Sequence, residues 1–229
     1  MGLPTEIPDR DTMIELDNIS KTFGSRRVVD RVSLIIPDQG RVALLGPSGS
    51  GKTTLLRLIA GLEVPDSGTI TIDGRLVSSR DCMVPPAERS IGFVFQNSAL
   101  WPHMTVAENI RFSLADLPYP EQQQRTRSLM ERMGILPLAD RYPDQVSGGE
   151  ARRIALARAL APRPATLLLD EPLTNLDRSL REDLLVLVLE SVRVAGSRML
   201  YVTHDENEAE KIGGTIVRFE RGATCSEGI

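Results

Sequence analysis

The sequence has few cysteines and no excess of basic residues. Cys82 and Cys225 are its only cysteines, far apart among 229 residues. Two such cysteines do not make a disulfide framework, so we expect a reduced, cytosolic protein. The formal net charge is −4, whereas a nucleic-acid-binding surface would show clustered lysine and arginine. We therefore expect no nucleic acid among its partners.

Long hydrophobic runs are also missing. A membrane-spanning helix needs roughly 20 consecutive apolar residues, and no run in the sequence approaches that length. Residues 1–6 contain no apolar core of a secretory signal. If the protein works at a membrane, we expect another polypeptide to supply the membrane-spanning part. The length itself suffices for one large domain with a sizeable core.

A glycine-rich loop with the spacing G-x4-G-K-T lies between an apolar run, residues 41–45, and a run with helical spacing, residues 54–60. The loop consists of Gly46, Pro47, Ser48, Gly49, Ser50, Gly51, Lys52 and Thr53. Strand, loop and helix in this order are what a phosphate-binding loop requires, because glycines let successive N–H groups point at phosphate oxygens. We expect Lys52 to reach the β- and γ-phosphates and Thr53 to ligate Mg2+, while Thr54 continues the helix start. The sequence therefore predicts a nucleoside triphosphate site.

The pattern of apolar residues predicts an α/β fold. Alternation over residues 13–36 and 69–74 indicates strands of an antiparallel sheet that flanks the nucleotide site. Residues 167–169 are apolar without alternation, as in a central parallel strand covered on both faces. The other expected elements are a helix over 178–194, strands over 198–203 and 214–219, and a frayed end over 221–229.

The middle of the chain is rich in helix signals. Thr105 begins a stretch with capping-box spacing, and a second helix is expected over residues 121–133. We interpret this region as a helical subdomain inserted between strands of a parallel sheet. The expected organisation is one domain, residues 1–229, with a catalytic core and antiparallel part over about 13–96 and 162–220 and the insert over about 97–161.

Two adjacent acids, Asp170 and Glu171, close the apolar strand at 167–169. Ligands of parallel α/β sheets bind at the carboxyl ends of the strands, so we expect both acids to face the phosphate loop's ligand. Asp170 is suited to hold Mg2+ through water, and Glu171 to orient and deprotonate the attacking water.

The stretch Val146-Ser147-Gly148-Gly149-Glu150 is the second informative motif. Ser147 and Glu150 have capping-box spacing for a helix that runs to Ala161. Two glycines in a first turn weaken a helix, each by up to about 1 kcal/mol relative to alanine, so close approach of the backbone to a ligand is the better explanation. The unpaired N–H groups at a helix start form an anion site. The sequence therefore predicts two anion sites, one after the phosphate loop and one at residues 147–150.

At these motifs the chain resembles, over nearly its whole length, the ATPase subunit of ATP-binding-cassette (ABC) transporters. Residues 146–150 resemble the family's signature, and residues 46–53 and 167–171 its two Walker motifs. The resemblance implies a P-loop ATPase fold that binds ATP. By position it assigns an adenine contact to Phe23 with Val28 in the same site, the Q-loop glutamine to Gln96, the D-loop to 174–177 with Asp177, and the switch histidine to His204. The implied catalytic residues are Glu171, His204, Lys52 and Gln96, and the implied Mg2+ ligands are Thr53, Gln96 and Asp170.

The resemblance also implies a head-to-tail dimer with two ATP molecules between the phosphate loop of one subunit and the signature helix of the other. The residues that would serve the partner's nucleotide are Ser147, Gly148, Gly149 and Glu150. Val146 and Thr174 depart conservatively from the family's pattern, whereas Glu150 in place of glutamine adds a negative charge near a nucleotide. No departure removes a catalytic group, so we expect hydrolysis. A homodimer and a heterodimer remain open.

Residues 85–106 resemble the importers for sugars, polyamines, iron, sulfate and related anions. Members of that group often carry a β-rich regulatory domain, which we expect this chain to lack because it stops at Ile229. The resemblance implies permease subunits, a substrate-binding protein acting through them, and a peripheral position on the cytoplasmic face of the cell (inner) membrane. Trp101 either lines the groove for the permease's coupling helix or is a buried packing residue. The alternative function is a soluble ATPase of the same family that drives a cytosolic assembly such as iron–sulfur cluster biogenesis.

Overall fold

The computed structural model describes residues 13–174 and 176–225. Contacts divide the chain into two compact units, which we call unit 1 (Met1–Ile91 and Arg198–Ile229) and unit 2 (Gly92–Ser197). The predicted division into a core and a helical insert uses other boundaries and stays a prediction.

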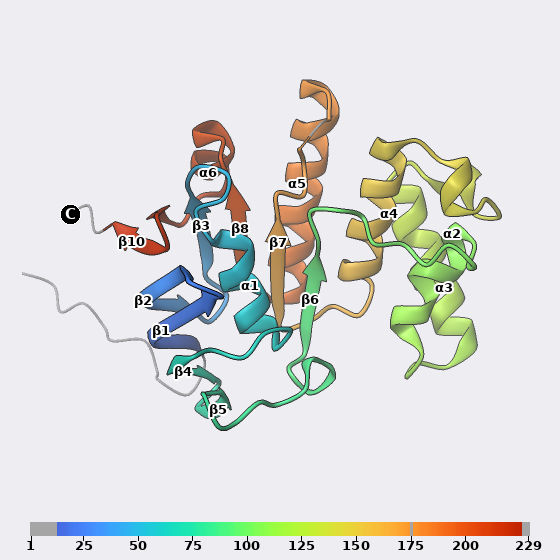
Figure 1. Ribbon diagram of the computed structural model, residues 1–229. Helices are drawn as coiled ribbons and strands as arrows, with labels where there is room; N and C mark the ends of the chain where they lie inside the picture. The colour runs from blue at the N-terminus through green and yellow to red at the C-terminus, as the bar shows by residue number, and fades with distance from the viewer. Residues whose placement is uncertain (1–12, 175, 226–229) are drawn as a thin grey trace, which may run out of the picture. The chain divides into compact units, whose positions relative to one another are not determined.

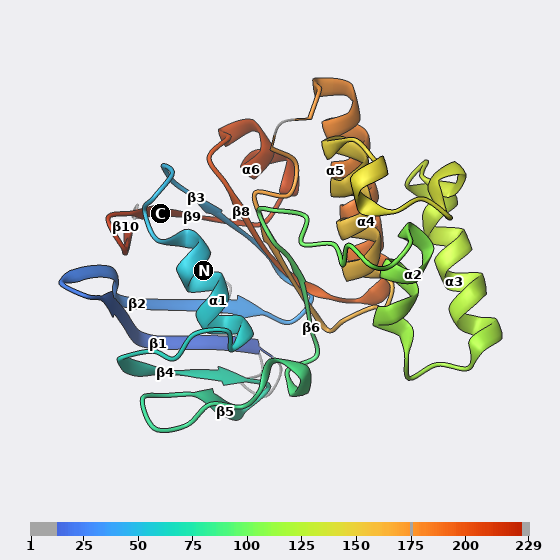
Figure 2. The same ribbon diagram turned by 45° about the vertical axis from the view of Figure 1, so that its right-hand side comes forward.

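Unit 1 contains an antiparallel sheet with the strand order β2-β1-β4-β5, which Figure 2 shows side by side. The strands are β1 (Met13–Phe23), β2 (Arg26–Pro37), β4 (Ser67–Ile72) and β5 (Arg75–Ser78). The alternation in β1 buries Ile14 and Leu16 while Glu15 is exposed, so one face of the sheet covers the core of unit 1. The predicted antiparallel sheet is confirmed.

Unit 1 also contains parallel strands that meet at the phosphate loop. In this group β3 (Arg41–Leu45) pairs in parallel with both β8 (Arg198–Thr203) and β9 (Thr215–Glu220). Four of the five β3 residues are buried, as expected for a strand covered on both faces. The expectation of a frayed end is wrong for β10 (Ala223–Cys225), which pairs antiparallel with β9; residues 226–229 lie outside the described part.

The helices of unit 1 are α1 (Lys52–Ala60) and α6 (Glu206–Ile212), together with a 3-10 turn, η1 (Pro86–Glu88). Helix α1 ends at Gly61, whose φ of 75° is left-handed. At this end the buried guanidinium of Arg89 donates to the carbonyls of Ile59 and Val84. Burial lowers the pKa of Arg89, and the carbonyl oxygens compensate its charge where α1 carries its negative dipole end.

Unit 2 combines helices with two neighbouring strands, β6 (Ile91–Val94) and β7 (Thr166–Asp170). Every residue of β7 is buried. The helices are α2 (Val106–Arg111), α3 (Tyr119–Arg132), α4 (Gly148–Leu160) and α5 (Arg178–Ala195), with 3-10 turns η2 (Phe112–Leu114), η3 (Leu136–Leu138) and η4 (Pro143–Gln145). Helices α2, α3 and α4 pack on one another, as Figure 1 shows. Sequence and structure agree on an α/β fold.

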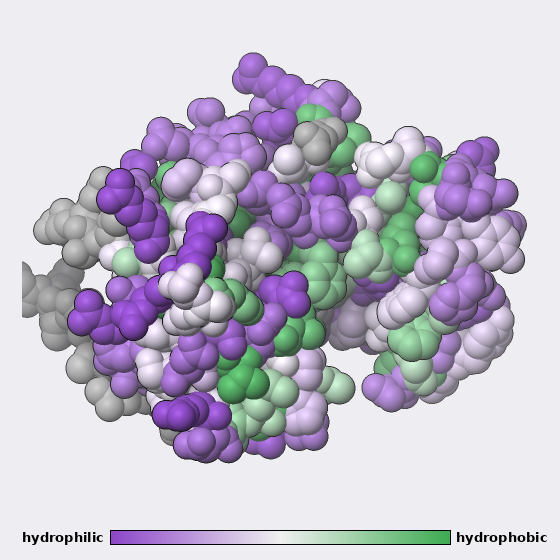
Figure 3. Space-filling view, in the orientation of Figure 1, coloured by the Kyte–Doolittle hydropathy of each residue, from purple (hydrophilic) through white to green (hydrophobic). Residues whose placement is uncertain are grey.

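None of the described helices is long and apolar enough to cross a membrane. The face seen in Figure 3 is mainly hydrophilic, with scattered apolar residues and no continuous apolar band.

Candidate functional site

The predicted phosphate loop connects β3 to α1 and requires glycine at two positions. A Cβ at Gly46 would collide with the carbonyl oxygen of Phe219, and a Cβ at Gly51 with that of Val28. Gly51 also has a φ of 107° and precedes α1 without a side-chain cap. The N-terminus of α1, which carries the positive end of the helix dipole, is a type of site that suits an anion.

Lys52 lies within this loop. Its side chain is buried, and its Nζ donates to the carbonyl oxygens of Gly46 (2.7 Å) and Pro47 (2.8 Å). The ammonium is therefore held in the curve of the loop, where it complements a polyphosphate. Nearby, the buried hydroxyl of Ser50 has no hydrogen-bond partner among the described residues. A buried polar atom of this kind calls for a partner, and a phosphate oxygen fits it.

A cavity of about 310 Å3 lies beside the loop in unit 1. It is lined by Val28, the loop and three arginines that belong to none of the predicted motifs, namely Arg26, Arg27 and Arg221. Arg26 donates to the carbonyl of Gly49 at 3.4 Å. Phe23, the predicted adenine contact, is 46% exposed, with Lys21 Nζ 5.3 Å from its ring centroid. An exposed aromatic next to a basic cavity suits a base followed by phosphates.

His204 follows β8 and is exposed. The preceding residue, Thr203, accepts a hydrogen bond from Gly46 N–H through its carbonyl (3.3 Å) and one from Asp205 N–H through its hydroxyl (3.0 Å). Its hydroxyl donates to the buried carboxylate of Glu208 at 2.8 Å. Thr203 thereby fixes both the start of the phosphate loop and the chain on either side of His204.

The two predicted acids lie at the end of β7 in unit 2, and both are buried. Glu171 has a φ of 45°, in the left-handed region, where a residue with a side chain is strained. Its Oε2 is 3.4 Å from the hydroxyl of Thr174, which donates to it. The structure therefore holds the proposed base in an unusual backbone conformation.

Arg152 of α4 connects these acids to Gln96. Its Nη1 donates to the carbonyl oxygens of Gln96 (2.7 Å) and Glu171 (3.3 Å). Gln96 itself is exposed just beyond β6. The structure thus brings the backbones of Gln96 and Glu171 together with the N-terminal half of α4, through an arginine that belongs to none of the predicted motifs.

The predicted capping box at the start of α4 is present. Ser147 Oγ accepts from Glu150 N–H at 3.3 Å, and Glu150 Oε2 accepts from the backbone N–H and the hydroxyl of Ser147 at 2.7 and 2.8 Å. These hydrogen bonds, the backbone one first, hold the pKa of Glu150 below its usual range. A carboxylate is therefore fixed at the helix N-terminus.

Gly148 and Gly149 differ in what surrounds them. A Cβ at Gly149 would lie 3.3 Å from Leu176 Cδ2, whereas a Cβ at Gly148 would meet no described atom within 4 Å. None of the described residues therefore requires glycine at position 148. Close approach of a group from outside the chain remains a reason for it.

Two other predicted positions have structural roles. Asp177 caps α5 by accepting from Leu180 N–H at 3.0 Å, and Asn175 of the predicted D-loop lies outside the described residues. Trp101 is half-buried, with its ring 4.6 Å from that of Phe112 and 4.7 Å from the Arg158 guanidinium. Burial lowers the pKa of Arg158. One face of the tryptophan thus packs while part of it stays exposed.

Comparisons with known proteins identify the family of the chain. A family model described as "ABC transporter" matches residues 29–174. The chain is 44% identical over 211 residues to the Fe(3+) ions import ATP-binding protein FbpC of Escherichia coli O157:H7, covering 91% of this chain and 60% of the relative. It is 48% identical over 215 residues to the sulfate/thiosulfate import ATP-binding protein CysA of Vibrio cholerae, covering 91% and 56%. The chain thus spans about three fifths of the length of these curated relatives.

Solved structures match the fold over most of the chain. A structure described as the dimeric structure of MJ0796, a bacterial ABC transporter cassette, superposes with a TM-score of 0.85 at 32% identity, covering 93% of this chain and 97% of that one. A second structure of that cassette, in a dimeric post-hydrolysis state bound to ADP and Pi, gives a TM-score of 0.84 at 31% identity with the same coverage.

Proposed function

Because the chain belongs to the ABC transporter family, we propose that it binds and hydrolyses ATP and that closure of an ATPase dimer drives transport through a separate permease. The geometry of the phosphate loop carries this proposal. Lys52 Nζ is buried on the loop's own carbonyls, Ser50 Oγ lacks a partner among the described residues, and the start of α1 is uncapped. All three features complement the oxygens of a triphosphate.

The proposed chemistry is an in-line attack of water on the γ-phosphate. Lys52 binds the β- and γ-phosphates, and Glu171 orients the water and accepts its proton. His204 contacts the γ-phosphate, and Phe23 with Val28 holds the adenine. When bound, Mg2+ neutralises charge on the β- and γ-phosphate oxygens. The residues proposed to hold it are Thr53, Gln96 and Asp170.

We propose that the second subunit completes each site. Gly148 makes room for a group from outside the chain, and Ser147, Gly149, Glu150 and Asp177 lie on or next to helix starts that can face the partner's nucleotide. The MJ0796 structures are described as dimeric, which supports the pairing. On this proposal, residues 1–229 act as one ATPase domain.

Import is the direction that the relatives favour, since FbpC and CysA are named as import ATP-binding proteins. Neither is named for a cytosolic assembly, so the transporter is preferred over a soluble ATPase. The proposed partners are a membrane-spanning permease and, through it, a substrate-binding protein. On this proposal the chain itself lies peripherally on the cytoplasmic face of the inner membrane, bound to the permease. The half-exposed Trp101 is proposed to line the permease groove, so its emission should shift to the blue when a permease binds.

The experiment that tests the function is the substitution Glu171→Gln. It should retain MgATP binding but lower the hydrolysis rate at least about 10²-fold, because the base is lost while the phosphate contacts remain. Gel filtration should then show a dimer trapped by ATP. Lys52→Ala should instead lose ATP affinity, and Glu131→Gln, on the exposed side of α3, should behave as wild type. A Glu171→Gln variant with wild-type turnover would remove Glu171 from the reaction.

A further inference from the structure

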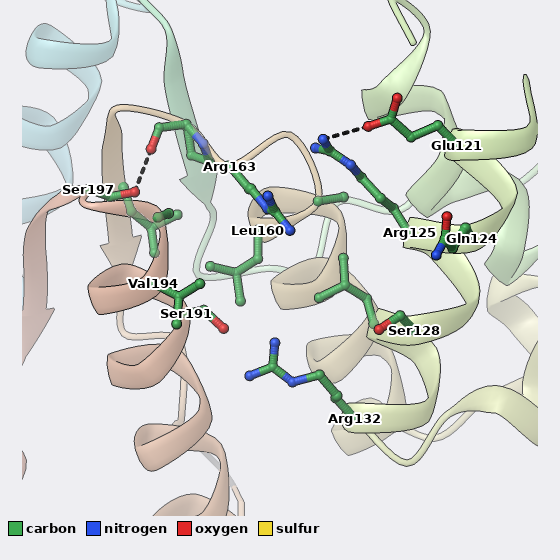
Figure 4. Close-up of a pocket in the computed structure, with 15 residues that line it drawn as sticks. Glu121, Gln124, Arg125, Ser128, Arg132, Leu160, Arg163, Ser191, Val194 and Ser197 are labelled. Atoms are coloured by element: carbon green, nitrogen blue, oxygen red, sulfur yellow. Dashed lines mark hydrogen bonds and ion pairs between the residues drawn. The ribbon is translucent and has the colours of Figure 1, made fainter. Parts of the chain in front are cut away.

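Unit 2 contains a hollow of about 360 Å3 that the proposed ATPase does not use. It is lined by α3, the last turns of α4 and α5, and the segment that leads into β7, as Figure 4 shows. Its apolar surface includes Leu129, Leu160 and Val194. Volumes of this size are typical of sites for small organic molecules. We call it the arginine hollow, after the three arginines that line it, Arg125, Arg132 and Arg163.

The arginines outnumber the acids of the hollow. Arg125 is bonded to Glu121 at 2.7 Å, and Arg132 lies 3.5 Å from Glu190, which is not part of the lining. Glu121 is the one acid among the lining residues, so they carry a net positive charge on a chain whose net charge is −4. Such a concentration of one sign in a concave site favours an anion.

Arg163 differs from the other two arginines. Its guanidinium makes no hydrogen bond or ion pair within the described part of the chain, and Figure 4 shows it extending into the hollow. Its φ is 55°, in a region that glycine or asparagine adopts with less strain. A strained backbone that presents an available guanidinium favours a role for this side chain in binding.

We propose that the arginine hollow binds a small organic anion that has an apolar part. Arg163 pairs with the phosphate or carboxylate group, which guanidinium groups hold by two parallel hydrogen bonds. Ser128 of α3 and Ser191 of α5 line the hollow from opposite sides. The Ser128 hydroxyl supplies a further donor, whereas the Ser191 hydroxyl donates to the Leu187 carbonyl at 2.8 Å and can accept a hydrogen bond. The apolar part rests on Leu129, Leu160 and Val194.

A ligand in this hollow touches the segment that leads into the acidic strand. Pro164 and Leu167 belong to the lining, and Leu167 is part of β7, which ends at Asp170. The Pro164 carbonyl also accepts from Ser197 Oγ at 2.6 Å. Binding should therefore raise the melting temperature, because the ligand stabilises the folded chain.

Calorimetric titration of the full chain with phenyl phosphate tests the proposal. Saturating MgADP keeps the probe out of the phosphate loop. We expect one saturable site, weaker binding of inorganic phosphate, which lacks the apolar part, and no binding of phenol. Arg163→Ala should weaken phenyl phosphate binding about tenfold or more, the loss expected for a charged hydrogen bond. Arg127→Ala, on α3 but outside the lining, should leave it unchanged.

A second pair of variants guards against effects on folding. Val194 and Val186 are both exposed on α5, at 69% and 60%, and only Val194 lines the hollow. Val194→Asp should abolish binding by repelling the anion, whereas Val186→Asp should not. The proposal is overturned if no saturable binding occurs, if phenol binds as well as phenyl phosphate, or if binding survives both Arg163→Ala and Val194→Asp.

Discussion

Arg152 shows how one residue can organise a site without touching a substrate. Its guanidinium donates to the carbonyls of Gln96 and Glu171. It therefore fixes the backbone at both residues, and with it the positions of the Gln96 and Glu171 side chains. Arg152→Met would leave both carbonyls without this donor, a loss of about 1–3 kcal/mol for each buried group that stays unpaired. We expect the kcat of ATP hydrolysis to fall about tenfold or more and the affinity for ATP to stay nearly unchanged.

The matched control for Arg152 is Arg153→Met on the same helix. Arg153 donates to the carbonyls of Met133 and Gly134, so its loss should lower the melting temperature but spare kcat. Steady-state kinetics and thermal unfolding of both variants distinguish positioning from stability. If Arg152→Met keeps wild-type kcat, Arg152 has only a structural role.

At the scale of elements, the Glu150 carboxylate at the start of α4 has two roles: it caps the helix, and it lies where the partner's nucleotide is proposed to bind. The pKa of Glu150 is lowered by its hydrogen bonds to Ser147. The ionised carboxylate therefore stabilises the folded chain above the unfolded pKa of about 4.3. This contribution to the free energy of unfolding is lost as the pH falls through the lower pKa of the folded state. Glu150→Gln should therefore be less stable than wild type at neutral pH, with the difference vanishing in acid. Urea unfolding at several pH values measures this.

The same variant should strengthen the ATP-bound dimer several-fold, because it removes a negative charge from a helix start proposed to face the partner's triphosphate. Glu108→Gln is the matched control. Glu108 closes the capping box of α2, and its pKa is lowered in the same way by Thr105. It should reproduce the pH-dependent loss of stability without changing dimerisation in sedimentation. An equal effect of both variants on the dimer would contradict the assignment of α4.

Elements whose signals are local could be predicted from the sequence. The capping boxes that begin α2 and α4 and the glycine that ends α5 each lie within a few residues of their helix. Strand β10 was missed because three residues carry too little periodicity. Arg152 was missed because its bond to Gln96 spans 56 residues, and Arg89 because its carbonyl partners come from three separate segments. Such contacts depend on tertiary structure and leave no local pattern.

At the scale of the whole molecule, the two anion sites are proposed to belong to different subunits. Gly148→Asp would place a carboxylate where the chain leaves open space, so it should block dimerisation by repelling the partner's nucleotide while monomers still bind ATP. Lys52→Ala should fail to bind ATP but keep an intact helix start. Each variant alone should be inactive.

A mixture of these two variants leaves one composite site with two intact halves. We expect measurable hydrolysis from the mixture, at a fraction of the wild-type rate, in a coupled phosphate-release assay. Two Lys52→Ala preparations mixed together serve as the control. Inactivity of the mixture, under conditions in which heterodimers are shown to form by sedimentation, would contradict the shared site.

At position 171 the left-handed backbone conformation lowers the stability of the fold, whereas the glutamate side chain is proposed to be needed for hydrolysis. A residue other than glycine or asparagine in this conformation lowers the free energy of unfolding by roughly 1–3 kcal/mol. With its φ of 45°, the proposed base Glu171 therefore destabilises the folded chain. A library randomised at position 171 and selected only for heat resistance should collect glycine and asparagine. Those survivors should melt at a higher temperature and no longer turn over ATP, whereas selection for ATP turnover should restore glutamate.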